Sequence, residues 1–431
     1  MSRLLWPFIY AASIVAAPPL IAAEIPFPAA APAAVPIAGG PNLSLSDAIA
    51  RALNANPEMR VSQAELDASH AARTQANALP NPELSVLMED LRAGRRTTTW
   101  QLSERLELGG KRQARNQLAG SVVAIAQAEQ AAKHQALRAA VTEAFYQALA
   151  AQERIKLSQS ALSLAQRVHD AAIRRLAAGK VAPIEGSKAL VAQASAQLEF
   201  SQAQSELRVA RDQLAGLLGL PKADFASLDG SLQSLPAPLS WEQLEARLQD
   251  APELQRAGHE LQRRQADIAL QRSLRVPDIT VSAGVKRDEA LGENMAVVGV
   301  SLPIPLFQQN QGGLLEAVRR ADKAQAEQQS TYLRHRGQLL QTFERFNNTR
   351  EEAESLRLQV LPAASNAYEL ASKGYELGKF NILDVLDAQR SLFQIQASYL
   401  RVMLDVHRHA AEIERLTGGT ANAATPSVKQ E

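Results

Sequence analysis

Residues 55–59 read Ala-Asn-Pro-Glu-Met, and residues 250–254 read Asp-Ala-Pro-Glu-Leu. The two prolines are separated by 252 − 57 = 195 positions, and a later pair of glycines, Gly179 and Gly378, by 378 − 179 = 199 positions. The offset between the two copies therefore drifts by only four residues along a whole half of the chain. Because two copies are too few for a solenoid, we interpret the sequence as one supersecondary unit that has been duplicated.

Two strands are predicted in each half from the alternation of apolar and polar side chains. Leu84, Val86 and Met88 fall on one face of the first strand, and the other three strands alternate in a similar way. A period of two residues is typical of a strand with one apolar face. The four predicted strands span about 82–90, 97–107, 277–286 and 295–306.

Stretches almost free of proline and glycine predict long helices in both halves. The longest two, at about 110–177 and 312–377, would form rods of roughly 100 Å at 1.5 Å per residue, and Pro362 should bend the second rod. A Gly-Lys turn follows each rod, after which a shorter helix returns. The other predicted helices span about 45–78, 184–218, 241–274 and 382–416.

The two repeats, 43–220 and 239–419, are joined and flanked by segments of different composition. Residues 1–23 combine a basic start, a short apolar stretch and small residues at a plausible cleavage site, which is typical of a secretory signal peptide. A membrane anchor is the alternative, and the short apolar stretch argues against it.

We also expect no transmembrane helix elsewhere, because no further run of 18 or more apolar residues occurs. The remaining segments are a Pro/Ala-rich lead-in at 24–42, a linker at 221–238 and a flexible tail at 420–431.

The composition argues against several classes of function. The formal net charge is +1, with 46 Lys+Arg against 45 Asp+Glu, and only 4% of the residues are aromatic, which disfavours nucleic-acid binding. The chain has no cysteine, so it can form neither a disulfide nor a thiolate metal site. His407 and His409 lie two apart on a predicted helix and face different ways, which makes a shared metal poor geometry. No phosphate loop, HExxH motif or nucleophile elbow is found, so we expect no enzyme, no metal site and no cofactor.

The number of strands determines how the chain could meet a membrane. Two strands per half give four per chain, and four antiparallel strands cannot close a barrel in lipid, where eight is about the minimum. An open sheet edge is not tolerated there, because it leaves backbone groups unpaired. We therefore predict a homotrimer that forms a 12-stranded membrane β-barrel, continued by a 12-helix periplasmic tunnel. A soluble coiled-coil adaptor or structural rod in the periplasm is the alternative from another class.

The order of elements resembles that of the TolC-type outer-membrane efflux factors over about residues 43–419. The most specific stretch, Tyr375-Glu-Leu-Gly-Lys-Phe-Asn-Ile-Leu-Asp-Val-Leu-Asp-Ala388, is similar to the periplasmic tip of that family. Residues 79–84 and 102–112 are similar to the branch that exports cobalt, zinc and cadmium with resistance-nodulation-division (RND) pumps.

This resemblance implies a passive exit duct in the outer membrane of a Gram-negative bacterium. The duct would dock with a periplasmic adaptor protein and an inner-membrane RND pump, and it would export heavy-metal cations. Multidrug efflux or type I secretion are the alternatives for its cargo.

The resemblance also assigns roles at the tip. Asp384 and Asp387 would form acidic rings at a narrow pore gate, whereas the alternative is a pair of helix N-terminal acids favoured by the macrodipole. Tyr375 and Glu185 resemble the partners that latch neighbouring tip helices together, although Phe380 stands where the family commonly has an arginine. The tip turns, which are also the expected adaptor contacts, consist of Gly179, Lys180, Gly378 and Lys379.

Overall fold

The computed structural model describes residues 42–419, apart from 91, 93, 238 and 239. The predicted signal peptide at 1–23, the lead-in at 24–42 except for its last residue, and the tail at 420–431 lie outside the described residues.

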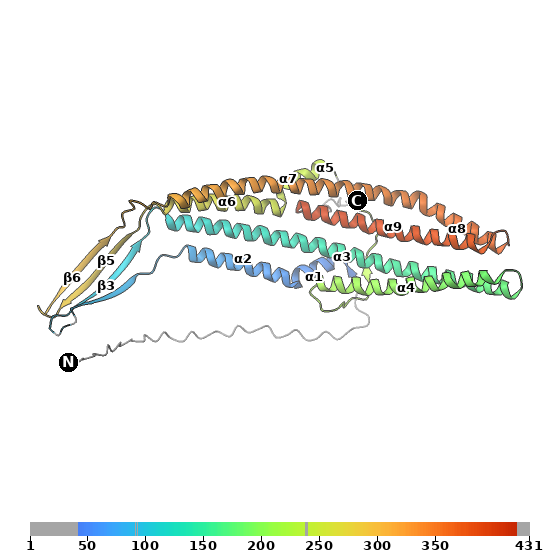
Figure 1. Cartoon of the computed structure of the whole chain (residues 1–431), viewed down its shortest axis with the longest axis horizontal. Coiled ribbons are helices and arrows are strands. Elements are labelled where there is room, and N and C mark those ends of the chain that lie inside the picture. Colours follow the sequence, from blue (N-terminus) through green and yellow to red (C-terminus); the bar gives the residue numbers. More distant parts are fainter. Residues whose placement is uncertain (1–41, 91, 93, 238–239, 420–431) are drawn as a thin grey trace, which may run out of the picture. The chain divides into compact units, whose positions relative to one another are not determined.

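Four strands form one antiparallel sheet in the order β2-β3-β5-β6 (Figure 1). Their bounds are β2 Glu83–Glu89, β3 Thr97–Leu106, β5 Ile279–Asp288 and β6 Glu293–Ser301. The predicted strand at 295–306 was too long at its end, because Pro303 and Pro305 have no N–H with which to continue a ladder. In this order β2 and β6 are the two edges of the sheet.

The register of the sheet separates apolar from polar side chains. Val86, Trp100, Val285 and Ala296 are paired across the four strands and therefore share one face. The neighbouring row, on the other face, consists of Ser85, Gln101, Gly284 and Val297. One face of the sheet is thus largely apolar, although the side chains on it are exposed in the single chain.

The helices of the first half are α1 Leu45–Ala55, α2 Pro57–Ala76, α3 Lys111–Ala177 and α4 Pro183–Leu217. The single helix expected at 45–78 is broken at Asn56, because a residue before proline avoids the helical conformation. Asn56 has ψ 128°, and its side chain instead caps α2 by accepting a hydrogen bond from Glu58 N–H.

The second half has the same order with more interruptions. The helix expected at 241–274 is divided before Pro252, at the position that matches the break in the first half. The rod expected at 312–377 contains five residues of π-helix at Leu356–Val360, which end two residues before Pro362. Proline lacks an N–H and its ring clashes with the carbonyl four residues earlier, and a wider turn accommodates both. The elements are α5 Trp241–Arg247, η1 Leu248–Asp250, α6 Pro252–Ser273, α7 Gln311–Ser355, η2 Leu356–Val360, α8 Leu361–Glu376 and α9 Ile382–Thr417.

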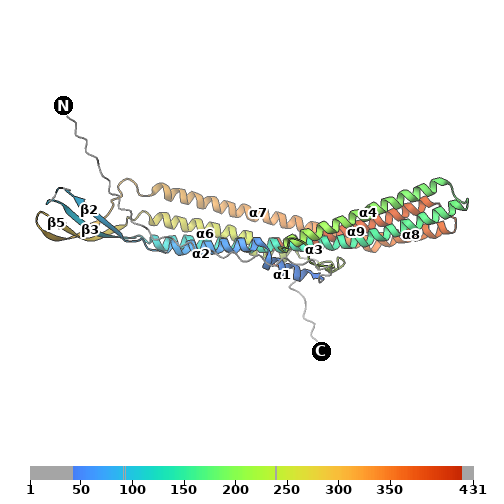
Figure 2. The same cartoon turned by 90° about the horizontal axis from the view of Figure 1, so that it is seen from below.

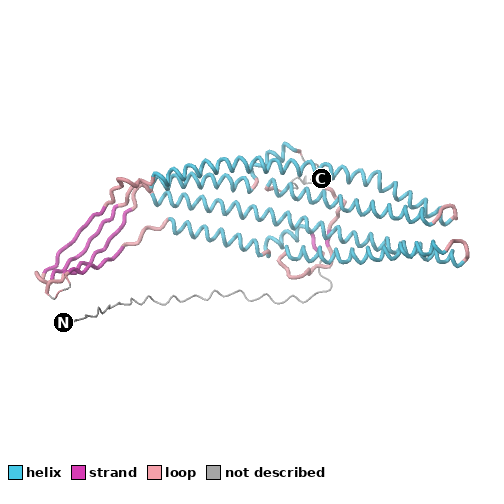
Figure 3. The backbone as a smooth tube through the Cα atoms, viewed as in Figure 1, coloured by secondary structure: helices cyan, strands magenta, loops and turns pink. Residues whose placement is uncertain are grey.

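The helices continue the order of the strands. Next to the sheet, α2 packs on α3, α3 on α6, and α6 on α7; farther from it, α4 packs on α3, α3 on α9, and α9 on α7 and α8 (Figures 1 and 3). The elements β2, α2 and α4 therefore lie along one edge of the chain, and β6, α7 and α8 lie along the other.

Most of the buried apolar side chains lie where the shorter helices meet. One cluster surrounds Phe145 of α3, and it includes the short parallel pair of β1 Leu43–Ser44 and β4 Leu228–Asp229. A second cluster surrounds Phe346 of α7 and joins it to α5 and α9. Among the described residues, no helix has a stretch both long and apolar enough to cross a bilayer.

Candidate functional site

The two Gly-Lys turns lie at the same end of the chain, far from the sheet (Figures 1 and 2). Gly179 and Gly378 have φ of +66° and +73°, which glycine adopts without strain. Lys180 N–H donates to Arg175 O at 3.0 Å, and Lys379 N–H donates to Gly374 O at 2.8 Å. Both rods therefore end in the same way, with a left-handed glycine that allows the chain to reverse.

Asp384 lies in the first turn of α9 and caps its own helix. Its carboxylate accepts a hydrogen bond from Asn381 N–H, and the Asn381 side chain accepts one from Asp384 N–H, both at 3.1 Å. Asp387 is exposed and has no hydrogen bond or ion pair among the described residues. The capping box is what the alternative interpretation of Asp384 predicts, whereas the role of both acids as a pore gate stays a prediction.

Tyr375 and Glu185 are not joined by a hydrogen bond in the part of the chain that the structure describes. The Tyr375 side chain is only 7% exposed and packs in an apolar cluster with Ala172 of α3 and Ile382 of α9. The Tyr375 hydroxyl and Glu185 Oε2 are both buried without a hydrogen-bond partner among the described residues. The predicted latch is therefore untested in a single chain, which leaves both atoms unsatisfied.

Arg175 was not predicted as a site residue, yet it contacts Tyr375 directly. Its guanidinium lies over the Tyr375 ring, with 4.4 Å from Cζ to the ring centroid. Its Nη1 also donates to the Tyr375 carbonyl oxygen at 3.3 Å. No local signal could have revealed this pair, because a basic residue in the last turn of a helix is already favoured by the macrodipole.

Phe380 takes no part in a polar latch in the single chain. Its ring lies against Gly374, where an added Cβ would come within 2.1 Å of the ring. The side chain is half exposed. Phe380 therefore packs the second tip turn against α8 by apolar contact, and its side chain is uncharged.

A second cluster of charged residues lies where the strands meet the long helices. Lys111 Nζ, at the start of α3, donates to Oδ1 of Asp278, the residue before β5, and Leu108 N–H donates to the same oxygen at 3.2 Å. Burial alone would raise the pKa of Asp278, but these hydrogen bonds outweigh it and hold the pKa below its ordinary value. This ion pair joins the first repeat to the second.

Arginines complete this junction. Arg115 forms a bidentate ion pair with Glu107 and donates to Ala76 O at 3.3 Å, while Arg112 donates to Asn77 O at 2.8 Å. The guanidinium groups thus satisfy carbonyls that the end of α2 leaves free. The residues that follow the second strand are therefore structural in the single chain.

The family follows from comparison with known proteins. The sequence profile of the outer membrane efflux protein family matches residues 48–220 and 244–419. The chain belongs to the outer membrane efflux protein family. Its two matched segments correspond to the two repeats, and membership assigns the protein to transport in the outer membrane and not to catalysis. The alternative of a soluble periplasmic rod is therefore wrong.

Relatives of this outer membrane efflux protein include proteins named for metal resistance. It is 42% identical over 381 residues to the cobalt-zinc-cadmium resistance protein CzcC of Cupriavidus metallidurans, covering 88% of this chain and 91% of that protein. It is 29% identical over 283 residues to the nickel and cobalt resistance protein CnrC of the same organism, covering 64% of this chain and 67% of CnrC.

Solved structures of outer membrane efflux proteins have the same fold. The crystal structure of CusC matches with a TM-score of 0.75 at 19% identity, over 87% of this chain and 92% of that one. The outer membrane protein VceC of Vibrio cholerae matches with a TM-score of 0.74 at 19% identity, over 87% of this chain and 96% of that one. The predicted fold class, mainly α-helical with a sheet in a duplicated unit, is confirmed.

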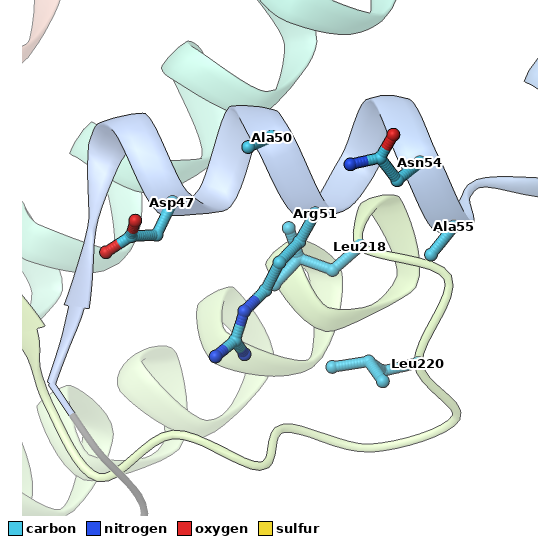
Figure 4. Close-up of a pocket in the computed structure, with 7 residues that line it drawn as sticks. All are labelled: Asp47, Ala50, Arg51, Asn54, Ala55, Leu218 and Leu220. Carbon is cyan, nitrogen blue, oxygen red and sulfur yellow. The ribbon is translucent and has the colours of Figure 1, made fainter.

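His407 of this efflux protein is buried, and its ring has partners on two sides. His407 stacks on Tyr146 at 3.8 Å and donates from Nε2 to Leu232 O at 3.1 Å. Among the described residues, no group of three or more His, Asp or Glu side chains is placed to hold a metal ion. A groove of about 450 Å³ beside α1 is shown in Figure 4 and is lined by Asp47, Ala50, Arg51, Asn54, Ala55, Leu218 and Leu220.

Proposed function

We propose that three copies of this chain form the outer-membrane channel of a tripartite efflux system that exports heavy-metal cations. The observation that carries this proposal is the common order of strands and helices, which leaves two free edges along the chain. In lipid, the backbone groups of β2 and β6 need partners. Pairing β2 of one copy with β6 of the next supplies them, and three copies give the twelve strands of a closed barrel.

The helices at the two edges support the same assembly. Ile184, Val191 and Leu198 recur every seven residues along α4, and each is more than half exposed in the single chain. At the other edge, Leu333 and Leu340 are exposed on α7 with the same spacing. A seven-residue apolar repeat is typical of a helix that packs along another helix. The stripe on α4 lies in the half of the chain far from the sheet and the stripe on α7 in the half next to it, so each is a surface for a helix of the neighbouring chain at its own level.

The tip residues take their roles in this trimer. The Tyr375 hydroxyl and Glu185 Oε2 find partners on the neighbouring chain, since a buried polar atom without a hydrogen bond costs about 1–3 kcal/mol. The Gly179–Lys180 and Gly378–Lys379 turns are the surface for a periplasmic adaptor protein. An inner-membrane RND pump supplies the energy, because the channel itself is passive.

Mass measurement and conductance test the assembly. The purified protein in detergent should have the mass of a trimer, and it should conduct with a preference for cations in planar bilayers. A monomer without membrane-embedded sheet, or a correctly inserted trimer without conductance, would contradict the proposal.

Charge-neutral variants test the gate. Asp384→Asn keeps an acceptor for Asn381 N–H, whereas alanine would also remove the helix cap. The double variant with Asp387→Asn should lower cation selectivity, as measured by the reversal potential in a salt gradient. Asp170, an exposed acid of α3, provides the control variant Asp170→Asn, which should leave selectivity unchanged. Equal reversal potentials for the double variant and the wild type would remove the gate.

Sensitivity of a deletion strain tests the cargo. The similarity to CzcC and CnrC, both named for metal resistance, supports metal cations over drugs or secreted polypeptides. Deletion should raise sensitivity to zinc, cobalt and cadmium and leave sensitivity to hydrophobic drugs unchanged. The reverse pattern would favour multidrug efflux, and a lost secreted polypeptide would favour type I secretion.

A further inference from the structure

Arg175 joins the two helical hairpins of one chain close to their tips. The stacking on Tyr375 and the hydrogen bond to the Tyr375 carbonyl connect the end of α3 to the end of α8. We propose that Arg175 is a positioning residue that holds the α3–α4 and α8–α9 hairpins of each chain together and so keeps the tip of the channel narrow. This inference rests on the proposed channel function.

Tyr375 gives the arginine a fixed surface to stack on. The ring is held in an apolar cluster that both hairpins build, with Ala172 and Ala189 from the first and Ala371 and Ile382 from the second. A buried ring cannot follow a moving guanidinium. Separation of the hairpins therefore breaks the contact between Arg175 and Tyr375.

The Arg175 side chain lies at the surface, beside the apolar cluster. A groove of about 600 Å³ lies beside it, lined by Arg167, Tyr368, Ser372 and other residues of α3 and α8. The Arg175 side chain is half-buried at the side of this groove. The guanidinium can therefore move from the Tyr375 ring into water without leaving a buried cavity. The contact between Arg175 and Tyr375 can thus break and form again.

No other polar contact does the same at the tip. Among the described residues 160–200 and 365–400, the hydrogen bond of Arg175 is the only hydrogen bond or ion pair that joins the two hairpins. Phe380, in the second turn, packs on Gly374 of its own hairpin. Within these ranges, Arg175 is therefore the residue that joins the two hairpins by a polar contact.

Single-channel recording of the full-length trimer in planar bilayers tests the proposal. Arg175→Gln should raise the probability of the high-conductance state roughly tenfold for each of the three contacts that must break on opening, the size expected when one stacked cation is lost. Arg175→Lys keeps the charge but loses the planar group that stacks on the ring. Its probability of the high-conductance state should lie between those of the wild type and Arg175→Gln. Arg174→Gln, at the exposed neighbouring arginine, is the matched control and should behave as the wild type.

The same recordings separate Arg175 from the latch in the proposed function. Tyr375→Phe removes the hydroxyl but keeps the ring and the carbonyl, so the contact with Arg175 survives. Opening by Arg175→Gln and not by Tyr375→Phe supports Arg175 and rejects the hydroxyl latch, whereas opening by both supports both. An Arg175→Gln channel that matches Arg174→Gln, or a wild type already as open as Arg175→Gln, overturns the inference.

A distance measurement tests the hairpins without requiring conductance. The chain contains no cysteine, so Leu190→Cys on α4 and Leu370→Cys on α8, both exposed in the single chain, can be spin-labelled uniquely. In trimers where labelled chains are diluted with unlabelled ones, Arg175→Gln should shift the distribution of distances to longer values. An unchanged distribution overturns the inference, and a shift in trimers that never conduct overturns the proposed channel while leaving the contact established.

Discussion

Replacing Lys111 by methionine should destabilise the junction between strands and helices. The Lys111 side chain is 8% exposed and that of Asp278 21%, so the variant leaves a largely buried carboxylate without its counter-ion. Removing one partner of a buried pair typically costs about 3–5 kcal/mol. Because Asp278 is still reached by water and keeps the hydrogen bond from Leu108 N–H, we expect about 2–3 kcal/mol per chain.

A double-mutant cycle measures the coupling within this pair. Asp278→Asn keeps an acceptor for Leu108 N–H, so the double variant with Lys111→Met should be less destabilised than the sum of the single variants. The assay is denaturant unfolding of the full-length protein in detergent, followed by tryptophan fluorescence, to which Trp100 of the sheet contributes. Arg154→Met is the control, because its ion pair with Glu206 is exposed and should contribute under about 1 kcal/mol.

The effect of Lys111→Met should also depend on pH. The folded pKa of Asp278 lies below its unfolded value, so the carboxylate stabilises the fold above the unfolded pKa and this contribution is lost as pH falls through the folded pKa. The difference between Lys111→Met and the wild type should therefore shrink below about pH 4. Additive single variants, or a difference that does not change with pH, would refute the assignment of a buried ion pair.

Five further variants, at four positions, test local features of the fold. Gly109 and Gly110 both have φ above +70°, but only at Gly109 would a Cβ meet Val276, at 2.7 Å, so Gly109→Ala should cost about 3 kcal/mol and Gly110→Ala about 1 kcal/mol in denaturant unfolding. Asn381→Ala removes a helix cap and should cost about 1 kcal/mol, whereas Asn381→Gly should cost only a few tenths. Burial lowers the pKa of His407 in spite of its hydrogen bond to a carbonyl, so the wild type should lose stability as pH falls below about 6.5, and His407→Phe should show a weaker dependence between pH 7.5 and 5.5. Equal costs at the two glycines, no cost at Asn381, or an unchanged slope for the histidine variant would each contradict the corresponding argument.

Much of the architecture could be predicted because it is encoded locally. Alternation along 83–89 and 279–288 marks strands, and glycines that recur at a nearly constant offset mark both tip turns. The errors also have local causes. Leu302 and Ile304 continue the apolar alternation, but the prolines beside them end the ladder, and Asn56 precedes a proline that breaks the first helix.

The contacts of the candidate site were less predictable. Arg175 and Tyr375 are 200 positions apart in the sequence, and only the packing of two hairpins brings them together. Asp384 shows a different limit, since an acid in the first turn of a helix satisfies the requirements of both a cap and a pore. The sequence pattern is the same for both roles, and only measurements on the assembled channel separate them.

The π turn in the second repeat makes the two halves of each chain unequal. Duplication alone would place six like hairpins around the bore, but α3 runs unbroken for 67 residues whereas its counterpart changes to a π turn after 45. Around the proposed tunnel, the unbroken helix of the first repeat then alternates with the interrupted helix of the second. The six hairpins are therefore equivalent only in two sets of three. The bore at the tip should accordingly have a three-cornered outline, with one bend in each chain about which it can change width.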